Sequence, residues 1–104
     1  MTMTKENEPI FQLAVNEYGA LSQILMLFEE TGELTASLNQ MMRGRVSIER
    51  VAEEVADVRI MLDQLSFALE SLTGKGTTKD EFNEMVNEIY AVKVSQLAEM
   101  LCGF

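Results

Sequence analysis

Acidic residues are the side chains in this sequence whose spacing first suggests chemistry. Three pairs stand three positions apart: Glu30/Glu33, Glu54/Asp57 and Glu81/Glu84. Residues three apart share one side of an α-helix, so each pair can present two carboxylates together. With 17 acidic residues among 104, such pairs are expected by chance, and spacing alone identifies no site. Whether a pair could form a site therefore depends on the helix face that it occupies.

The first two pairs interrupt apolar stripes, whereas the third does not. Around Glu30, the neighbours on the same face are Met26, Leu27, Leu34, Leu38 and Met41. Around Glu54 they are Val51, Val58, Met61, Leu62 and Leu65. Glu33 and Asp57 lie about 60° away from Glu30 and Glu54 on their helices. The face of Glu81/Glu84 continues through Thr77 and Glu88, which predicts a solvated surface.

Carboxylates on buried stripes need neutralisation. A bare buried carboxylate costs several kcal/mol, and four together repel one another. Clustered Asp and Glu without His or Cys favour a hard cation, Mg²⁺ or Mn²⁺. Two facing helices with two carboxylates each can surround one or two ions, so we expect Glu30, Glu33, Glu54 and Asp57 to be the ligands. The alternative is that these acids pair with Arg or Lys at a rim, or border an interface.

Three further residues are candidates for contacting a substrate. Lys93 interrupts another apolar stripe and could reach a phosphate or balance the acids, or extend its charged end past the core. Gln23, on the face of Glu30, could read a substrate group or bond within the core. Arg43, beside Gly44 in a predicted loop, could bind phosphate or remain solvated.

Composition excludes several classes of function. A net charge of −9 argues against binding to nucleic acid or an anionic membrane, since both need a basic surface. The absence of histidine and the single Cys102 exclude zinc sites, His-based triads and an internal disulfide. With no apolar signal core and no run of 18 apolar residues, we expect a cytoplasmic protein.

The elements that must position these residues are four helices in one domain, residues 1–104. Residues 1–7 are polar and expected to be frayed. Helical periodicity and end signals predict helices over about 8–18, 21–42, 48–72 and 79–101, the third capped by Ser47 and the fourth by Thr78. Short connections favour an antiparallel four-helix bundle.

A resemblance joins these observations. Glu29-Glu30-Thr31-Gly32-Glu33, followed by Glu54-Val55-Ala56-Asp57, resembles the E-E-x-x-E…E-x-x-D signature of MazG-type all-α nucleoside triphosphate pyrophosphohydrolases. The similarity to small phage- and prophage-type members covers about residues 15–97. It includes the Arg43-Gly44 turn and a fourth-helix lysine, Lys93.

The resemblance implies Mg²⁺-dependent hydrolysis of an NTP or dNTP to its monophosphate and pyrophosphate. It places Glu30, Glu33, Glu54 and Asp57 as metal ligands, and Glu29 as a residue that orients or deprotonates water. One departure is that Gln96 and Leu97 stand where a basic residue often follows the helix-4 lysine. Two alternatives remain: a non-catalytic acidic helical binding or decoy module, and a family member that binds nucleotide without turnover.

A chain this short also predicts self-association, because four helices leave apolar area uncovered. Phe28, Ile60 and Phe67 lie off the main stripes, on faces that a lone bundle would expose. We expect a homodimer or, as the resemblance suggests, a homotetramer, with active sites near the subunit interface.

Overall fold

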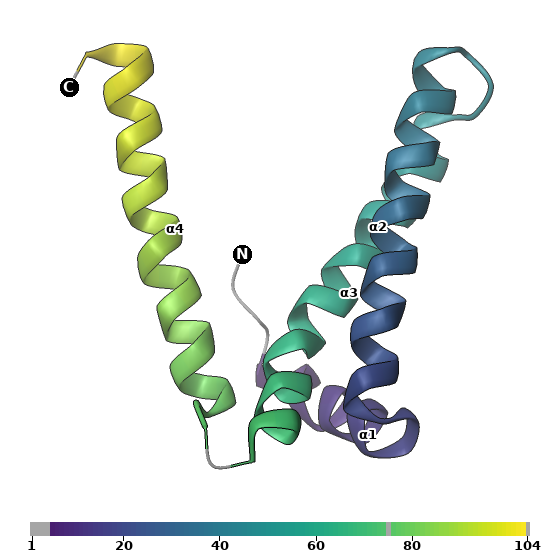
Figure 1. Ribbon diagram of the computed structural model, residues 1–104. Coiled ribbons are helices and arrows are strands. Elements are labelled where there is room, and N and C mark those ends of the chain that lie inside the picture. The colour runs from purple at the N-terminus through teal and green to yellow at the C-terminus, as the bar shows by residue number, and fades with distance from the viewer. Residues whose placement is uncertain (1–4, 75, 104) are drawn as a thin grey trace.

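The computed structural model describes residues 5–74 and 76–103, and their regular structure is entirely helical. A 3-10 turn, Lys5–Asn7, precedes α1 (Glu8–Tyr18), α2 (Ala20–Met42), α3 (Ile48–Thr73) and α4 (Lys79–Cys102) (Figure 1). Over the two described ranges there is no strand, which confirms the predicted all-α class. The 3-10 turn, an element that often precedes a helix, covers the last three of the seven residues expected to be frayed, and that expectation stays a prediction. Residues 1–4, and Lys75 in the predicted loop, lie outside the described ranges.

The helix ends follow from local side-chain chemistry. Ser47 Oγ accepts a hydrogen bond from the Arg50 N–H at 3.3 Å, and Thr78 Oγ1 accepts one from the Glu81 N–H at 3.2 Å. These bonds satisfy backbone donors that a helix start leaves free. Gly19, with φ +89°, allows α1 and α2 to meet without an intervening loop. The predicted caps of α3 and α4 are therefore confirmed.

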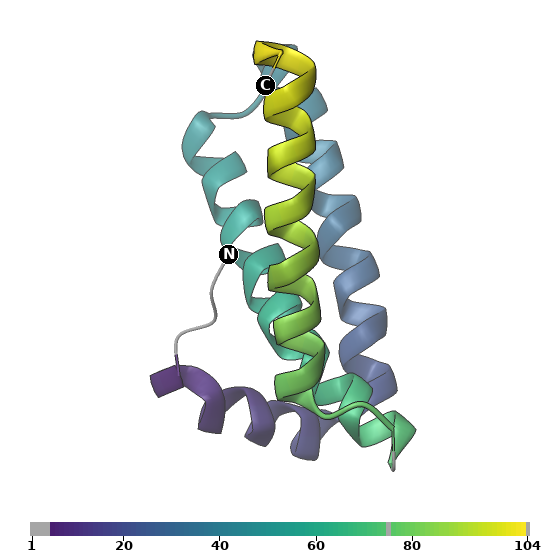
Figure 2. The same cartoon turned by 90° about the vertical axis from the view of Figure 1, so that its left-hand side faces the viewer.

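The buried core lies where α1 crosses the base of the molecule (Figure 2). Phe11 of α1 packs edge-on against Phe67 of α3, with ring centroids 6.1 Å apart, and Val15, Ala20 and Ala68 complete the cluster. The sequence analysis expected Phe67 on an exposed face, and this is wrong: Phe67 is 2% exposed. The reason is that α1 covers a side of α3 that two packed helices alone would leave open.

The metal-site candidates lie on an antiparallel hairpin formed by α2 and α3, which pack along most of their length. Val51 and Val58 are buried in this hairpin, as the apolar stripe predicts. Leu38 and Leu62, on the same predicted stripes, remain substantially exposed. The hairpin therefore buries only part of its apolar surface within one chain.

Helix α4 diverges from the hairpin, so that the molecule has the outline of a V (Figure 1). Among the described residues, α4 contacts α3 but neither α1 nor α2, and no α4 residue is buried. The Cα radius of gyration is 16.3 Å, against about 13 Å for a compact domain of this length. The four helices of one chain therefore do not enclose a single shared core.

The start of α4 is tied to the end of α3. The Lys79 N–H donates to Glu70 Oε2 at 2.7 Å, and Lys79 Nζ lies 5.6 Å from the centre of the Phe67 ring. These contacts join the first turn of α4 to the core beneath it. They fix the point from which α4 leaves the hairpin.

Candidate metal centre

Three predicted ligands converge in the middle of the α2/α3 hairpin. Glu30 and Glu33 come from adjacent turns of α2, and Glu54 comes from the facing side of α3. One carboxylate oxygen from each lies within 4.8 Å of the others. The i, i+3 spacing aligns the two α2 residues, and the antiparallel packing brings Glu54 beside them. The predicted encounter of these acids across two helices is therefore present.

Two of these carboxylates have oxygens removed from water. Glu54 is only 3% exposed, and Glu30 is half-buried. Oε2 of Glu30 and Oε2 of Glu54 are buried and, within the described part of the chain, have no hydrogen-bond partner. A buried acceptor without a donor is costly, so each of these oxygens is suited to a ligand from outside the chain.

Arg50 forms an ion pair with the carboxylate cluster. The sequence analysis considered pairing of these acids with Arg or Lys but did not identify Arg50 as the partner. Its Nη2 lies 3.1 Å from Glu54 Oε1, one helical turn away, and the Arg50 side chain is largely exposed. The i, i+4 spacing of Arg50 and Glu54 was the signal that could have identified this ion pair. Arg50 neutralises one oxygen of Glu54 and leaves the other, Oε2, unpaired.

The electrostatics of the cluster favour a cation. Burial raises the pKa of Glu30, and the charges of Glu33, Asp57, Glu54 and Glu29 raise it further. Burial also raises the pKa of Glu54 and outweighs the opposing effect of Arg50, while Glu33 and Asp57 raise it further. Ionised carboxylates are therefore destabilised in the free protein, and a positive ion among them would relieve both repulsion and desolvation.

The donor set and its spacing fit a small hard ion. Mg²⁺ binds oxygens at about 2.1 Å, so two of its ligands are at most about 4.2 Å apart. Oxygens already within 4.8 Å of one another would need to move only slightly to share one ion. Carboxylates without nitrogen or sulfur donors suit Mg²⁺ or Mn²⁺. The residues present therefore fit the cation that the sequence predicts.

Asp57 and Glu29 lie at the border of this cluster. Asp57 is exposed and raises the pKa of both Glu30 and Glu54 through its charge, but it is not among the three converging residues. Glu29 is exposed beside Glu30 and acts on its pKa in the same way. Both are close enough to influence an ion or water held by the other three.

The structure of one chain does not bring the three substrate candidates to the carboxylates. Gln23 is 4% exposed, and its Nε2 donates to Met26 Sδ at 3.7 Å, within α2. Arg43 is exposed where α2 ends, ten residues after Glu33 and about 15 Å farther along the helix axis. Lys93 is exposed on α4, which has no contact with α2 in the described ranges.

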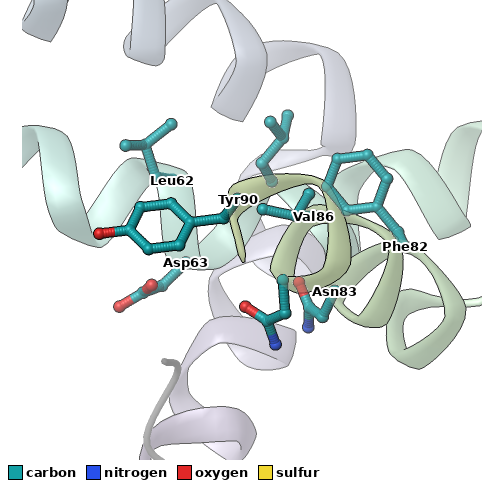
Figure 3. Close-up of a pocket in the computed structure, with 8 residues that line it drawn as sticks. Leu62, Asp63, Phe82, Asn83, Val86 and Tyr90 are labelled. Atoms are coloured by element: carbon teal, nitrogen blue, oxygen red, sulfur yellow. The ribbon is translucent and has the colours of Figure 1, made fainter. Parts of the chain in front are cut away.

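A second feature that the sequence analysis missed is a cavity of about 230 Å³ between α3 and α4 (Figure 3). Leu62 and Leu65 line one side, and Phe82, Val86 and Tyr90 line the other. Asp63, Asn83 and Asn87 add polar groups at its edge, and burial raises the pKa of Asp63 against the opposing charge of Arg59. No residue of the carboxylate cluster lines this cavity.

Comparison of the chain with protein-family models, curated proteins and solved structures found no match. Membership of the MazG-type family therefore stays a prediction that rests on the motif residues. Within the described residues, no helix is both long enough and apolar enough to span a lipid bilayer.

Proposed function

We propose that this chain is a Mg²⁺-dependent nucleoside triphosphate pyrophosphohydrolase. The observation that supports it best is the convergence of Glu30, Glu33 and Glu54, with two buried and unpaired carboxylate oxygens, between two helices. The motif E-E-x-x-E…E-x-x-D supplies the reaction class, because it resembles a family that hydrolyses nucleotides between the α- and β-phosphates. Glu30, Glu33 and Glu54 are selected by both criteria, whereas Asp57 and Glu29 are selected by the motif alone.

The proposed roles follow from position and charge. Glu30, Glu33 and Glu54 hold the metal, and Asp57 completes the ligand set from the next turn of α3. When bound, Mg²⁺ would neutralise phosphate oxygens, acidify a water and stabilise the pyrophosphate leaving group. To Glu29, which is exposed and adjacent to Glu30, we assign the role of orienting that water or accepting its proton.

Positive charge for the triphosphate has to come from residues outside the cluster. Lys93 and Arg43 are the candidates, and each supplies a donor that attracts phosphate. Arg50 already pairs with Glu54, so it serves the carboxylates before any substrate arrives. Neutralisation by metal and lysine together is needed because a chain of net charge −9 repels a polyanion.

The experiment is a product analysis. Purified chain is incubated with a panel of canonical and damaged NTPs and dNTPs in Mg²⁺, and monophosphate and pyrophosphate are quantified. One-step formation of NMP and pyrophosphate in equal amounts is expected, because attack of a metal-activated water on the α-phosphorus breaks only the bond to the β-phosphate oxygen. Nucleoside diphosphate and orthophosphate as first products would contradict the proposal.

A second function, a non-catalytic acidic helical module, is favoured by one observation. The Arg50–Glu54 ion pair is the arrangement expected if the acids merely stabilise the hairpin. In that case Glu54→Gln would destabilise the protein, and Mg²⁺ would have no effect on its stability. Measurements of the Tm of wild type and Glu54→Gln, with and without Mg²⁺, therefore separate the two hypotheses.

A further inference from the structure

The cavity between α3 and α4 is separate from the carboxylate cluster. Asp63, at its edge, follows Glu54 by nine residues, which places it about 14 Å farther along α3 and about 180° around the helix axis. None of the three converging acids lines the cavity. A ligand in the cavity would therefore lie on another side of α3 from an ion held by these acids.

The walls of the cavity suit a small ligand with an apolar body. Two leucines of α3 and three apolar or aromatic residues of α4 form them: Leu62, Leu65, Phe82, Val86 and Tyr90. The volume of about 230 Å³ is below the roughly 300–1,000 Å³ of sites for drug-sized molecules. Two of the lining side chains are aromatic, and their faces and edges can pack against another ring. The cavity therefore matches a ligand with one ring or one branched apolar group.

The polar groups at the edge of the cavity are one carboxylate and two amides. Asp63, Asn83 and Asn87 supply them, and no lining residue carries a positive charge. Within the described ranges, neither of the two salt bridges involves Asp63. Burial raises the pKa of Asp63 although the charge of Arg59 opposes this effect, so the ionised carboxylate is only partly compensated.

These polar groups determine which charge a ligand should carry. An anion would be repelled by Asp63 and by a chain of net charge −9. A neutral apolar ligand would remove water from the carboxylate without offering it a hydrogen-bond donor, at a high cost. A bare metal ion would find a single carboxylate and would leave the apolar walls hydrated. A cation attached to an apolar group satisfies both the edge and the walls.

We propose that this cavity binds a small organic cation, a primary ammonium carried on an aromatic or branched apolar group. Asp63 and the hydroxyl of Tyr90 lie at one end of the cavity, and Phe82 lies at the other (Figure 3). The ammonium donates to the Asp63 carboxylate, and its apolar group extends towards Phe82. Binding requires neither metal nor nucleotide, so this proposal can fail while the proposed function holds, and the reverse.

The bound cation would also hold α4 in place. Among the described residues α4 contacts α3 alone, and the hydrogen bond from the Lys79 N–H to Glu70 joins only its first turn. The cavity extends from Phe82 to Tyr90, about two turns of α4. A ligand there adds contacts between the two helices over this length, so it should slow the hydrogen exchange of α4 amides.

The test uses three probes that separate charge from apolar body. Phenethylammonium has both, phenethyl alcohol has the ring without the charge, and ethylammonium has the charge without the ring. Each is titrated into the full isotope-labelled chain in metal-free buffer while amide chemical shifts are recorded. Phenethylammonium is expected to bind with a Kd of about 1 mM or lower and to shift the side-chain amide signals of Asn83 and Asn87. The other two probes should bind at least about tenfold more weakly.

Matched variants test the cavity residues. Asp63→Asn removes the carboxylate and should weaken phenethylammonium binding by at least about tenfold. Glu99→Gln removes the same charge from an exposed position of α4, nine residues past Tyr90, and should bind as wild type does. Val86→Phe places a ring inside the cavity and should abolish binding, with circular dichroism as the check that each variant is folded.

Several results would overturn the proposal. One is equal affinity of the wild-type chain for phenethylammonium and phenethyl alcohol, since the charge would then not be recognised. A second is a set of shift changes centred on Glu30, Glu33 and Glu54, which would show that the amine only neutralises the carboxylate cluster. The third is the absence of saturable binding at millimolar phenethylammonium. These three results need only the wild-type chain, so they decide the question even if a variant does not fold.

Discussion

Replacement of Glu54 by glutamine tests the metal centre through the sign of a stability change. Without metal, the charge of Glu54 is held among Glu30, Glu33 and Asp57 in a site where burial raises its pKa. Glutamine keeps the shape and removes this repulsion, although it weakens the pair with Arg50 at 3.1 Å. Since burial outweighs Arg50 in its effect on the pKa, we expect Glu54→Gln to leave the metal-free Tm unchanged or higher.

The size of the expected change in Tm follows from how strongly bound Mg²⁺ stabilises the folded protein. A ligand present at 100 times its Kd stabilises the folded state by about 2.7 kcal/mol. For a domain of about 100 residues this corresponds to an increase in Tm on the order of 10 °C. Loss of one of the three converging ligands should remove most of that increase, because stabilisation follows affinity.

The assay is differential scanning fluorimetry at one fixed protein concentration, with Mg²⁺ varied from none to millimolar. Wild type is expected to show the full increase and Glu54→Gln little of it. Glu84→Gln, on the exposed face of α4, is the matched control and should behave as wild type. A lowered metal-free Tm for Glu54→Gln, together with no response of wild type to Mg²⁺, would refute the metal-centre reasoning.

Four other outcomes are expected. The pKa of Glu30 is raised above 4.5 in the metal-free protein, so protonated Glu30 contributes to stability below pH 4.5. That contribution is lost as the pH rises through the raised pKa. Glu30→Gln should therefore flatten this part of a curve of Tm against pH. Arg50→Gln frees Glu54 Oε1 and should tighten Mg²⁺ binding by calorimetry, whereas weaker binding would mean that Arg50 organises the site. Phe67→Ala should cost about 3 kcal/mol or more in urea unfolding, since this ring is fully packed; a loss below about 1 kcal/mol would contradict the core assignment. If the chain is a homodimer in which Lys93 of one chain serves the carboxylates of the other, an equimolar mixture of Lys93→Ala and Glu54→Gln chains should recover about one quarter of wild-type hydrolysis, since half of the dimers are mixed and each has one intact site. No recovery would place Lys93 and the carboxylates that it serves in the same chain.

The sequence predicted the helices and the buried acids well because both depend on local patterns. The end signals at Ser47 and Thr78 operate within one helical turn, and the structure confirms them. Glu54 was expected inside an apolar stripe, and it is buried. Periodicity is enough for such inferences, since a helix face is a property of a single segment.

What the sequence did not predict depends on how segments meet. Phe67 is buried because α1 crosses α3, a relation that no periodicity within α3 contains. Lys93 interrupts an apolar stripe as predicted, yet that stripe is exposed because α4 diverges from the hairpin. Asp57 shares the spacing of Glu33 but lies outside the converging group, since its position depends on the rotation of α3 against α2.

If the chain self-associates as its sequence predicts, the hydrogen bond between Glu70 and the first N–H of α4 affects how fast two chains can dock. Thr78 caps the start of α4 and Gly103 closes its end in a left-handed conformation, so local contacts already specify this helix before any partner is present. A prefolded arm held at one angle loses little conformational entropy on docking. Association by such an arm would be limited by collision and orientation rather than by folding. The rate at which two chains meet should then respond to salt more than to fraying of α4 on heating.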